Sequence, residues 1–350
     1  MVYSGVLEPL ANWSDPGKRK LWAIKAAHER DENRLLELLE AYLLLKGRKK
    51  ALISPETLRT YRTAIRDYIA WAWPEDAPGP RVHILQATSD DLDHYLNELQ
   101  TRGGHLPDNA RPLKPASVAT YLAGVRSFYR ALEWAGAAIA PDDVHAPADP
   151  TPREERRPAL PMELYRRLLD HLDNPEDDSK LRDRAMVRLM AEAGLRISEV
   201  IHLDEADLLA TERLLVVRSG KGGKQRSVPI SRSLAAELAY WMRLRKSHVI
   251  PGEPALFVNT GGRKNRGRRL SASMLRKRLA RYYQELGFPS RYHGAHMLRH
   301  TAGTRFYRAT GDLHVTARLL GHTNVNTSAI YAKMDIEGLR DAIDRLEEDA

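Results

Sequence analysis

Apolar and polar residues recur along the first 140 residues with the spacing of amphipathic helices, an apolar position every three or four residues. One of these stretches begins with Ser54 as a capping residue, carries Pro55 at its first helical position and stops at Pro74. The pattern predicts four helices, over residues 32–47, 54–73, 88–104 and 114–136.

The second half combines helical patterns with one region of β-branched residues. Residues 212–219 and 225–230 enclose the glycine turn GKGG, which predicts a β-hairpin. Helical patterns flank the hairpin and continue to the end of the chain. The last of them, at 334–350, places four apolar residues on one face: Ile336, Leu339, Ile343 and Leu346.

A proline-rich segment separates the two halves. Residues 136–161 contain six prolines among alanines and charged residues, and proline interrupts regular structure. We therefore predict an N-terminal extension at 1–33, a helical domain at 34–140, a linker at 141–158 and a second domain at 159–350. The expected fold class is mostly α with a small β-sheet.

Composition narrows the classes of function. The 350 residues include no cysteine, which excludes disulfides, thiolate zinc sites and cysteine nucleophiles. No uncharged apolar stretch reaches about 18 residues, so we expect no membrane span and a cytoplasmic location. The net charge is +9. Residues 151–350 hold 36 basic and 26 acidic residues, against 19 and 20 in residues 1–150, which indicates a polyanion such as nucleic acid as the partner.

Arg196 and Glu199 form the first candidate site. Arg196 follows the helix-stopping Gly194 in GLRISEV, and Glu199 lies three residues further on, near enough to hold the guanidinium. A guanidinium at a helix end offers a planar fork of donors that matches two phosphate oxygens. The same spacing suits a purely structural ion pair, so the motif alone leaves both interpretations open.

Lys221 and Lys224 lie in the glycine turn of the hairpin. A nucleotide-binding loop would need GxxxxGK[ST] at the start of a helix. Here Gln225 follows Lys224, and Arg218 stands where the first glycine would fall, so we exclude nucleotide binding. Two interpretations remain: a lysine that reaches into a site and delivers a proton, or a solvent-exposed turn.

The segment HMLRH, residues 296–300, offers another candidate. His296 and Arg299 share one face of a helix and can approach the same phosphate. His296 and His300 have the spacing of some metal ligands, but Met297 breaks the HExxH pattern and no third ligand cluster is evident. We predict no metal site here.

Tyr331 closes the series. In LLGHTNVNTSAIYAKM, His322 follows an apolar stretch and Tyr331 comes nine residues later. Taken alone, this tyrosine is most simply a packing residue with its hydroxyl in water. Together with the candidates above it completes an ordered set suited to one reaction: Arg196, Lys221, His296, Arg299, His322 and Tyr331.

On these motifs the chain resembles the tyrosine site-specific recombinases, the phage-integrase or Xer-type family. The resemblance rests on GLRISEV, GKGGKQRSVPI, HMLRHTAGT and LLGHTNVNTSAIYAKM, and covers about 155–335 and, more loosely, 34–140. It implies a two-domain, C-shaped DNA clamp with a helical, SAM-like core-binding domain and a mixed α/β catalytic domain. Residues 1–33 are not covered.

The resemblance assigns a role to each basic residue of the set. Arg196 and Arg299 would clamp the scissile phosphate, with Glu199 holding Arg196. Lys221 would protonate the leaving 5′ oxygen. Such residues suit the reaction because attack on a phosphodiester adds negative charge, which preorganised donors stabilise.

The same resemblance makes Tyr331 the nucleophile that forms a 3′-phosphotyrosine. A phenol with an ordinary pKa of about 10 is a poor nucleophile until cations and a base assist it. His296 would take its proton and His322 would donate to the phosphate. We expect the phenol and the two guanidinium groups to share one site.

No cofactor is implied, because the covalent link keeps the bond energy for rejoining. The expected partner is double-stranded DNA, bound by a homo- or hetero-tetramer at the nucleoid, with a partner recombinase or an activator as further candidates. The helix at 334–350 would dock on a neighbouring subunit or on its own domain. The implied role is chromosome or plasmid dimer resolution, or integration and excision of a mobile element.

Two other functions remain open. A type IB topoisomerase shares this chemistry but relaxes DNA without exchanging strands. The compact spacing and the separate helical domain favour recombination. A DNA-binding protein that cleaves nothing would explain the basic second half equally well.

Overall fold

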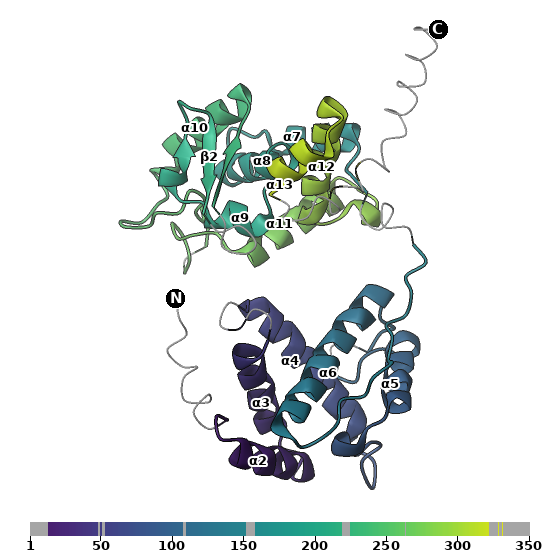
Figure 1. Ribbon diagram of the computed structural model, residues 1–350. Helices are drawn as coiled ribbons and strands as arrows, with labels where there is room; N and C mark the ends of the chain where they lie inside the picture. Colours follow the sequence, from purple (N-terminus) through teal and green to yellow (C-terminus); the bar gives the residue numbers. More distant parts are fainter. Residues whose placement is uncertain are drawn as a thin grey trace. The chain divides into compact units, whose positions relative to one another are not determined.

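The computed structural model describes residues 13–47, 50, 53–107, 110–151, 158–218, 225–262, 264–321, 328 and 331. The chain forms two compact units, 1–150 and 151–350, each with its own hydrophobic core (Figure 1). Their boundary falls within the segment predicted as the linker. No helix of the described ranges is long and apolar enough to cross a membrane. The predicted fold class, mostly α with a small sheet, is confirmed.

The first unit is helical. Ser54 caps the helix predicted at 54–73 by accepting the backbone N–H of Thr57 at 3.1 Å, and Thr88 and Asp91 form a reciprocal capping box at the start of the helix predicted at 88–104. Its elements in order are α2 (Pro16–His28), α3 (Glu32–Leu45), α4 (Pro55–Ala72), η2 (Ile84–Gln86), α5 (Ser89–Thr101) and α6 (Pro115–Ala135).

Helices α4 and α6 pack directly against each other in the core of this unit. The close approach needs Gly124, where a Cβ would lie 2.8 Å from the Cβ of Ala64. Beside it, the buried hydroxyl groups of Tyr68 and Tyr129 form a hydrogen bond of 2.5 Å. A polar pair buried in this way has its partner inside the core, so it fixes the two helices without leaving an unsatisfied group.

Helix α2 corrects the expected boundary at residue 34. We predicted a separate extension at 1–33, but Trp13, Ala23 and Ala26 are buried in the same core as α3, α4 and α6. Asp15 caps α2, and Pro16 occupies its first position. The described part of the extension is therefore an integral part of the helical unit.

The second unit surrounds one small sheet with helices. Its strands run in the order β1-β2-β3, both pairs antiparallel. Its elements in order are α7 (Met162–Leu172), α8 (Asp178–Ala191), α9 (Ile197–His202), η4 (Glu205–Asp207), β1 (Leu208–Leu209), β2 (Leu214–Val217), β3 (Arg226–Pro229), α10 (Arg232–Arg245), α11 (Ala272–Glu285), η5 (Ser290–Tyr292), α12 (Ala295–Thr310) and α13 (Leu313–Leu320).

The predicted hairpin is confirmed in its strands. Strand β2 pairs with β3 from Leu214 opposite Pro229 to Val217 opposite Arg226. Strand β1, only two residues long, pairs with the outer edge of β2 and was not predicted. Two residues carry too little periodicity to be recognised in a sequence.

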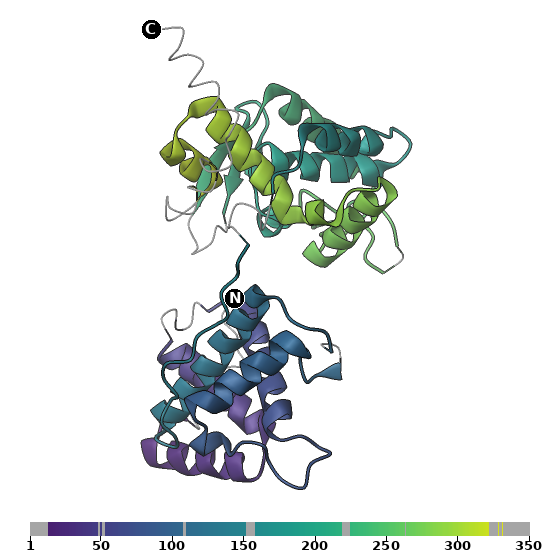
Figure 2. The same cartoon turned by 90° about the vertical axis from the view of Figure 1, so that its right-hand side faces the viewer.

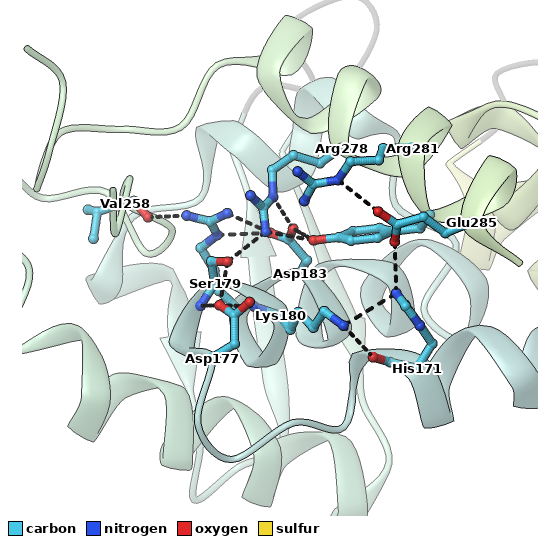
Figure 3. A network of polar contacts seen from close by, with 11 residues as sticks. His171, Asp177, Ser179, Lys180, Asp183, Val258, Arg278, Arg281 and Glu285 are labelled. Atoms are coloured by element: carbon cyan, nitrogen blue, oxygen red, sulfur yellow. Dashed lines mark hydrogen bonds and ion pairs between the residues drawn. The ribbon is translucent and has the colours of Figure 1, made fainter. Parts of the chain in front are cut away.

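A buried polar network joins α8 to α11 (Figure 3). The carboxylate of Asp183 is fully buried and accepts from Arg182 at 2.7 and 2.9 Å, from Tyr282 at 2.7 Å and from Arg278. Arg182 also donates to the carbonyl of Val258 at 2.8 Å. A buried charge that is fully paired specifies one arrangement of the elements around it, so this network fixes the scaffold on which the site is built.

Helices α12 and α13 are the yellow-green end of the described chain, and α12 packs against α8 (Figure 2). Gly194 makes the turn after α8 with a φ of +68°, a conformation that glycine adopts without strain. A Cβ there would lie 2.5 Å from Leu320 Cδ2 at the end of α13. The chain therefore brings the end of α8, the start of α9 and the end of α13 together.

Candidate active site

Glu199 is the centre of the candidate site. It lies in the first turn of α9 and is 3% exposed. Its Oε2 accepts the backbone N–H of Arg196 at 2.8 Å, and its Oε1 accepts Nη1 of Arg196 at 2.9 Å. The predicted Arg196–Glu199 pair is present, and the carboxylate serves as both helix cap and ion-pair partner.

Arg226, at the start of β3, holds the same carboxylate. Its Nη1 donates to Oε1 of Glu199 and its Nη2 to Oε2, both at 2.9 Å. Burial alone would raise the pKa of Glu199, but hydrogen bonds from Arg226 and from the backbone of Arg196 lower it below its usual value. Glu199 is therefore ionised and accepts four hydrogen bonds.

Arg299 approaches from α12. It is 3% exposed, its Nη1 lies 3.7 Å from Oε2 of Glu199, and it donates to the carbonyls of Gly194 and Leu320. Burial lowers the pKa of Arg299 to about 10, and the charge of Arg196 acts in the same direction. The guanidinium still carries its charge near neutral pH.

In the described part of the site, the guanidiniums of Arg196, Arg226 and Arg299 surround the carboxylate of Glu199. Their net charge is positive by two, and Arg196 is the most open of them, with a quarter of its side chain exposed. A partly desolvated cluster of this sign attracts an anion.

Tyr331 lies beside the cluster but is buried. It is 2% exposed and packs with Ala302 and Leu320, with Phe306 and Tyr307 at the edge of the group. Burial raises the pKa of Tyr331 to about 12, although the charges of Arg299 and Arg196 act in the opposite direction. The charges of both predicted arginines act on the phenol, which remains protonated in this position.

The ring of Tyr331 rests on the backbone of α12. A Cβ added to Gly303 would lie 2.1 Å from Cζ of the ring and 2.6 Å from its hydroxyl oxygen. No side chain larger than hydrogen fits between the helix and the ring. Gly303 therefore provides the surface on which the ring is seated.

The two histidines of α12 lie in different surroundings. His296 is exposed at the start of the helix, whereas His300 is buried, and its ring lies 5.7 Å from that of Tyr331. The rings of His296 and His300 are 5.2 Å apart. The histidine in direct contact with the tyrosine ring is thus His300, which the sequence suggested only as an unsupported metal ligand.

Lys221, His322 and the predicted helix at 334–350 lie outside the described residues. Among the residues that are described, no group of three or more histidines or carboxylates is placed to hold a metal ion. The structure thus brings Arg196, Arg299, Glu199 and Tyr331 together, with His296 at the edge of the group.

Arg226 was missed by the sequence argument, although a signal was available. Residues two apart in a strand share a face, and Val228 on the same face as Arg226 is buried. A basic residue on the inward face of a strand requires a buried partner. The sequence therefore indicated that Arg226 needs a buried partner, but it could not identify Glu199 as that partner.

Comparisons with known proteins show the family of the chain. Residues 159–337 match the phage integrase family, and residues 39–136 match the N-terminal SAM-like domain of phage integrases. Tyrosine recombinase XerC of Chromohalobacter salexigens is 36% identical over 294 residues, which cover 83% of this chain and 90% of the relative. XerC of Vibrio campbellii is 35% identical over 236 residues, 67% of this chain and 71% of the relative.

Solved structures share the fold. A XerH site-specific recombinase bound to its palindromic difH substrate after cleavage has a TM-score of 0.64 at 18% identity, with 95% of this chain and 97% of that chain covered. A lambda integrase dimer bound to a core site has a TM-score of 0.62 at 18% identity, with 86% and 95% covered. The chain belongs to the phage integrase family and is a tyrosine recombinase of the Xer-like kind.

Proposed function

We propose that this recombinase cleaves and rejoins DNA strands at a specific site through a 3′-phosphotyrosine formed by Tyr331. The observation that carries the proposal is the meeting of Arg196 and Arg299 at Glu199, with the charges of both acting on the hydroxyl of Tyr331. A phosphodiester at this cluster would meet its charge-stabilising donors and its nucleophile together.

The reaction is a transesterification. The phenolic oxygen of Tyr331 forms a bond to phosphorus while the bond from phosphorus to the 5′ oxygen breaks. The phenol's proton passes to His296, which is exposed on α12 where a substrate can reach it, and Lys221 protonates the departing oxygen. Arg196, Arg299 and His322 stabilise the charge on the non-bridging oxygens.

Rejoining is the reverse reaction. A 5′ hydroxyl attacks the phosphotyrosine, and the phenol leaves with its proton restored. The number of phosphoester bonds is unchanged throughout, so no nucleotide hydrolysis is needed.

The buried position of Tyr331 is a resting state in this account. A protonated phenol enclosed by apolar side chains cannot reach a phosphate, so the ring must leave its seat on Gly303 when DNA is bound. Once the ring is exposed, the burial that raises its pKa is removed and the cationic cluster acts alone.

The partner is double-stranded DNA, engaged by a homo- or hetero-tetramer at the nucleoid, with a second recombinase or an activator as an additional component. The XerC relatives and the XerH structure on a difH site support resolution of chromosome or plasmid dimers as the biological role. Sequencing of genomic DNA that is covalently trapped on the protein tests this role. A single chromosomal locus is expected, whereas ends of a mobile element would contradict it.

Covalent trapping on a nicked duplex tests the chemistry. The wild-type chain should form a protein–DNA adduct resistant to denaturation, and Tyr331→Phe should form none while binding the duplex normally. Tyr307→Phe, which removes a hydroxyl from the same cluster, is the matched control and should retain the adduct. An adduct with Tyr331→Phe would overturn the assignment of the nucleophile.

A further inference from the structure

We propose that Arg226 is a positioning residue for DNA cleavage: it neutralises Glu199 and so keeps the guanidiniums of Arg196 and Arg299 available to the scissile phosphate. The inference rests on the proposed function. It gives a role to a residue outside the set of six that the sequence motifs supplied.

Arg226 binds both oxygens of the Glu199 carboxylate. Its two terminal nitrogens donate to the two carboxylate oxygens at 2.9 Å each, the bidentate arrangement in which an arginine binds a carboxylate most strongly. The side chains are 16% and 2% exposed. The pair is therefore little weakened by solvent.

The remaining acceptor capacity of Glu199 is taken by Arg196. Each carboxylate oxygen already receives one bond from Arg226 and one from Arg196. Nη1 of Arg299 stays 3.7 Å from Oε2, beyond hydrogen-bond distance. Without Arg226, two acceptor positions would open beside Arg299 and Arg196, and the carboxylate would draw both guanidiniums toward itself.

The charge of the cluster leads to the same conclusion. Three guanidiniums and one carboxylate leave two positive charges. A phosphodiester carries one negative charge, and the phosphorane formed by attack carries two. Replacing Arg226 by a neutral residue would leave this group of described side chains with one positive charge, one fewer than the negative charges of the phosphorane.

Arg226 also touches the segment that leads toward His322 and Tyr331. A Cβ at Gly321, the residue that ends α13, would lie 2.9 Å from Nε of Arg226. The guanidinium therefore packs against the backbone there. The side chain of Arg226, the first residue of β3, thus links the sheet, the start of α9 and the end of α13.

A cycle of substitutions tests the role. The variants are Arg226→Gln, Glu199→Gln, both together, and Arg226→Lys. Each is assayed for its melting temperature without DNA, its affinity for a nicked duplex, and its rate of adduct formation at saturating DNA. Arg218→Gln is the control, because Arg218, which follows β2, holds a different buried carboxylate, that of Asp207.

Arg226→Gln should slow adduct formation by about 10- to 100-fold, the range found when a residue that orients a metal-binding side chain is lost, with little change in affinity. The double variant should recover most of this loss, because removing Glu199 as well restores two positive charges. Arg226→Lys should be intermediate, since it keeps the charge but loses the fork. Arg218→Gln should lower the melting temperature and the fraction of active protein, but not the rate of that fraction.

If the double variant does not recover the rate of adduct formation, the inference is overturned, because Arg226 would then contact the phosphate itself. A rate loss that only follows the melting temperature would overturn it too. An adduct absent from the wild-type chain would overturn the proposed function instead. In that case the melting temperatures alone still report whether Arg226 and Glu199 are coupled.

Discussion

At the scale of residues, the sequence allowed two interpretations of Arg196 and Glu199: a guanidinium that binds phosphate, or a structural ion pair. In the structure the ion pair is formed, and Arg196 is also partly open to a phosphate. A second arginine shares the carboxylate, and a quarter of the Arg196 side chain stays exposed. Local spacing was sufficient to predict Arg196 with Glu199, three residues apart. It could not predict Arg226, because that contact joins residues 27 positions apart.

The contact between the rings of His300 and Tyr331 could not be predicted either, because it joins residues that lie far apart in the sequence. The roles of Lys221 and His322 remain predictions, because both residues lie outside the described part of the chain.

Gly303 yields a prediction about the resting tyrosine. An alanine inside a helix usually stabilises it relative to glycine by about 0.5–1 kcal/mol. Here the added methyl would lie 2.1 Å from the ring of Tyr331. Gly303→Ala should therefore expel the ring, lower the pKa of Tyr331 from about 12 toward its ordinary value and make the phenol accessible. Nitration by tetranitromethane, quantified at Tyr331 by mass spectrometry, should rise several-fold.

The control for this experiment is Gly124→Ala. It places a Cβ 2.8 Å from Ala64 in the first unit, far along the chain from Tyr331. It should disturb packing there and leave nitration of Tyr331 unchanged. Equal nitration of Tyr331 in Gly303→Ala and the wild-type chain would show that the ring does not rest on Gly303.

At the scale of elements, strong periodicity and caps were reliable guides. Helices α4 and α5 begin where Ser54 and Thr88 cap them, and the strands of the hairpin lie where β-branched residues predicted them. Helix α2 was missed because its residues, PGKRKLWAIKAAH, include few large apolar side chains. Its burial depends on small alanines and on Trp13, a tertiary contact that periodicity does not reveal.

A buried acid and a histidine link α4 and α5 to the loop after α5. The carboxylate of Asp67 is fully buried and accepts the backbone N–H of His105 at 2.8 Å, while the His105 ring lies 3.4 Å from Asp67 and 3.1 Å from Glu98. Burial alone would lower the pKa of His105, but its hydrogen bonds with Asp67 and Glu98 raise it above the ordinary value. The protonated ring thus stabilises this part of the unit.

The pH dependence of unfolding tests that interaction. Because the folded pKa of His105 is raised, its contribution is complete below the ordinary histidine pKa of about 6.5 and is lost as pH rises through the folded value. His105→Gln should therefore destabilise the first unit most at acidic pH, by about 1.5–3 kcal/mol, the range for a hydrogen bond to a charged group, and least at alkaline pH.

Urea unfolding followed by tryptophan fluorescence measures this effect, since five of the six tryptophans lie in residues 1–150. His94→Gln, on the exposed side of α5, is the control. A destabilisation by His105→Gln that grows with pH would contradict the assigned direction of the shift.

At the scale of the whole molecule, the charge count alone gave an incomplete picture of the basic second half. Several of its arginines are internal partners of carboxylates or carbonyls rather than surface charges, among them Arg182, Arg226, Arg245, Arg278 and Arg299. Between residues 251 and 300 the described basic residues that remain exposed are Lys264, Arg266, Arg268, Arg276, Lys277, Arg281 and Arg291. The surface open to a polyanion is smaller than the composition indicated, and the site itself uses buried charge.

The central claim is that Tyr331 becomes ester-linked to DNA. Trypsin digestion of the adduct trapped on a nicked duplex, followed by mass spectrometry, tests it most directly. Cleavage after Arg318 and Lys333 isolates the peptide LLGHTNVNTSAIYAK, in which Tyr331 is the single tyrosine. If Tyr331 is the nucleophile, this peptide carries the nucleotide on its tyrosine, whereas a nucleotide on any other peptide would show that a different residue attacks the DNA.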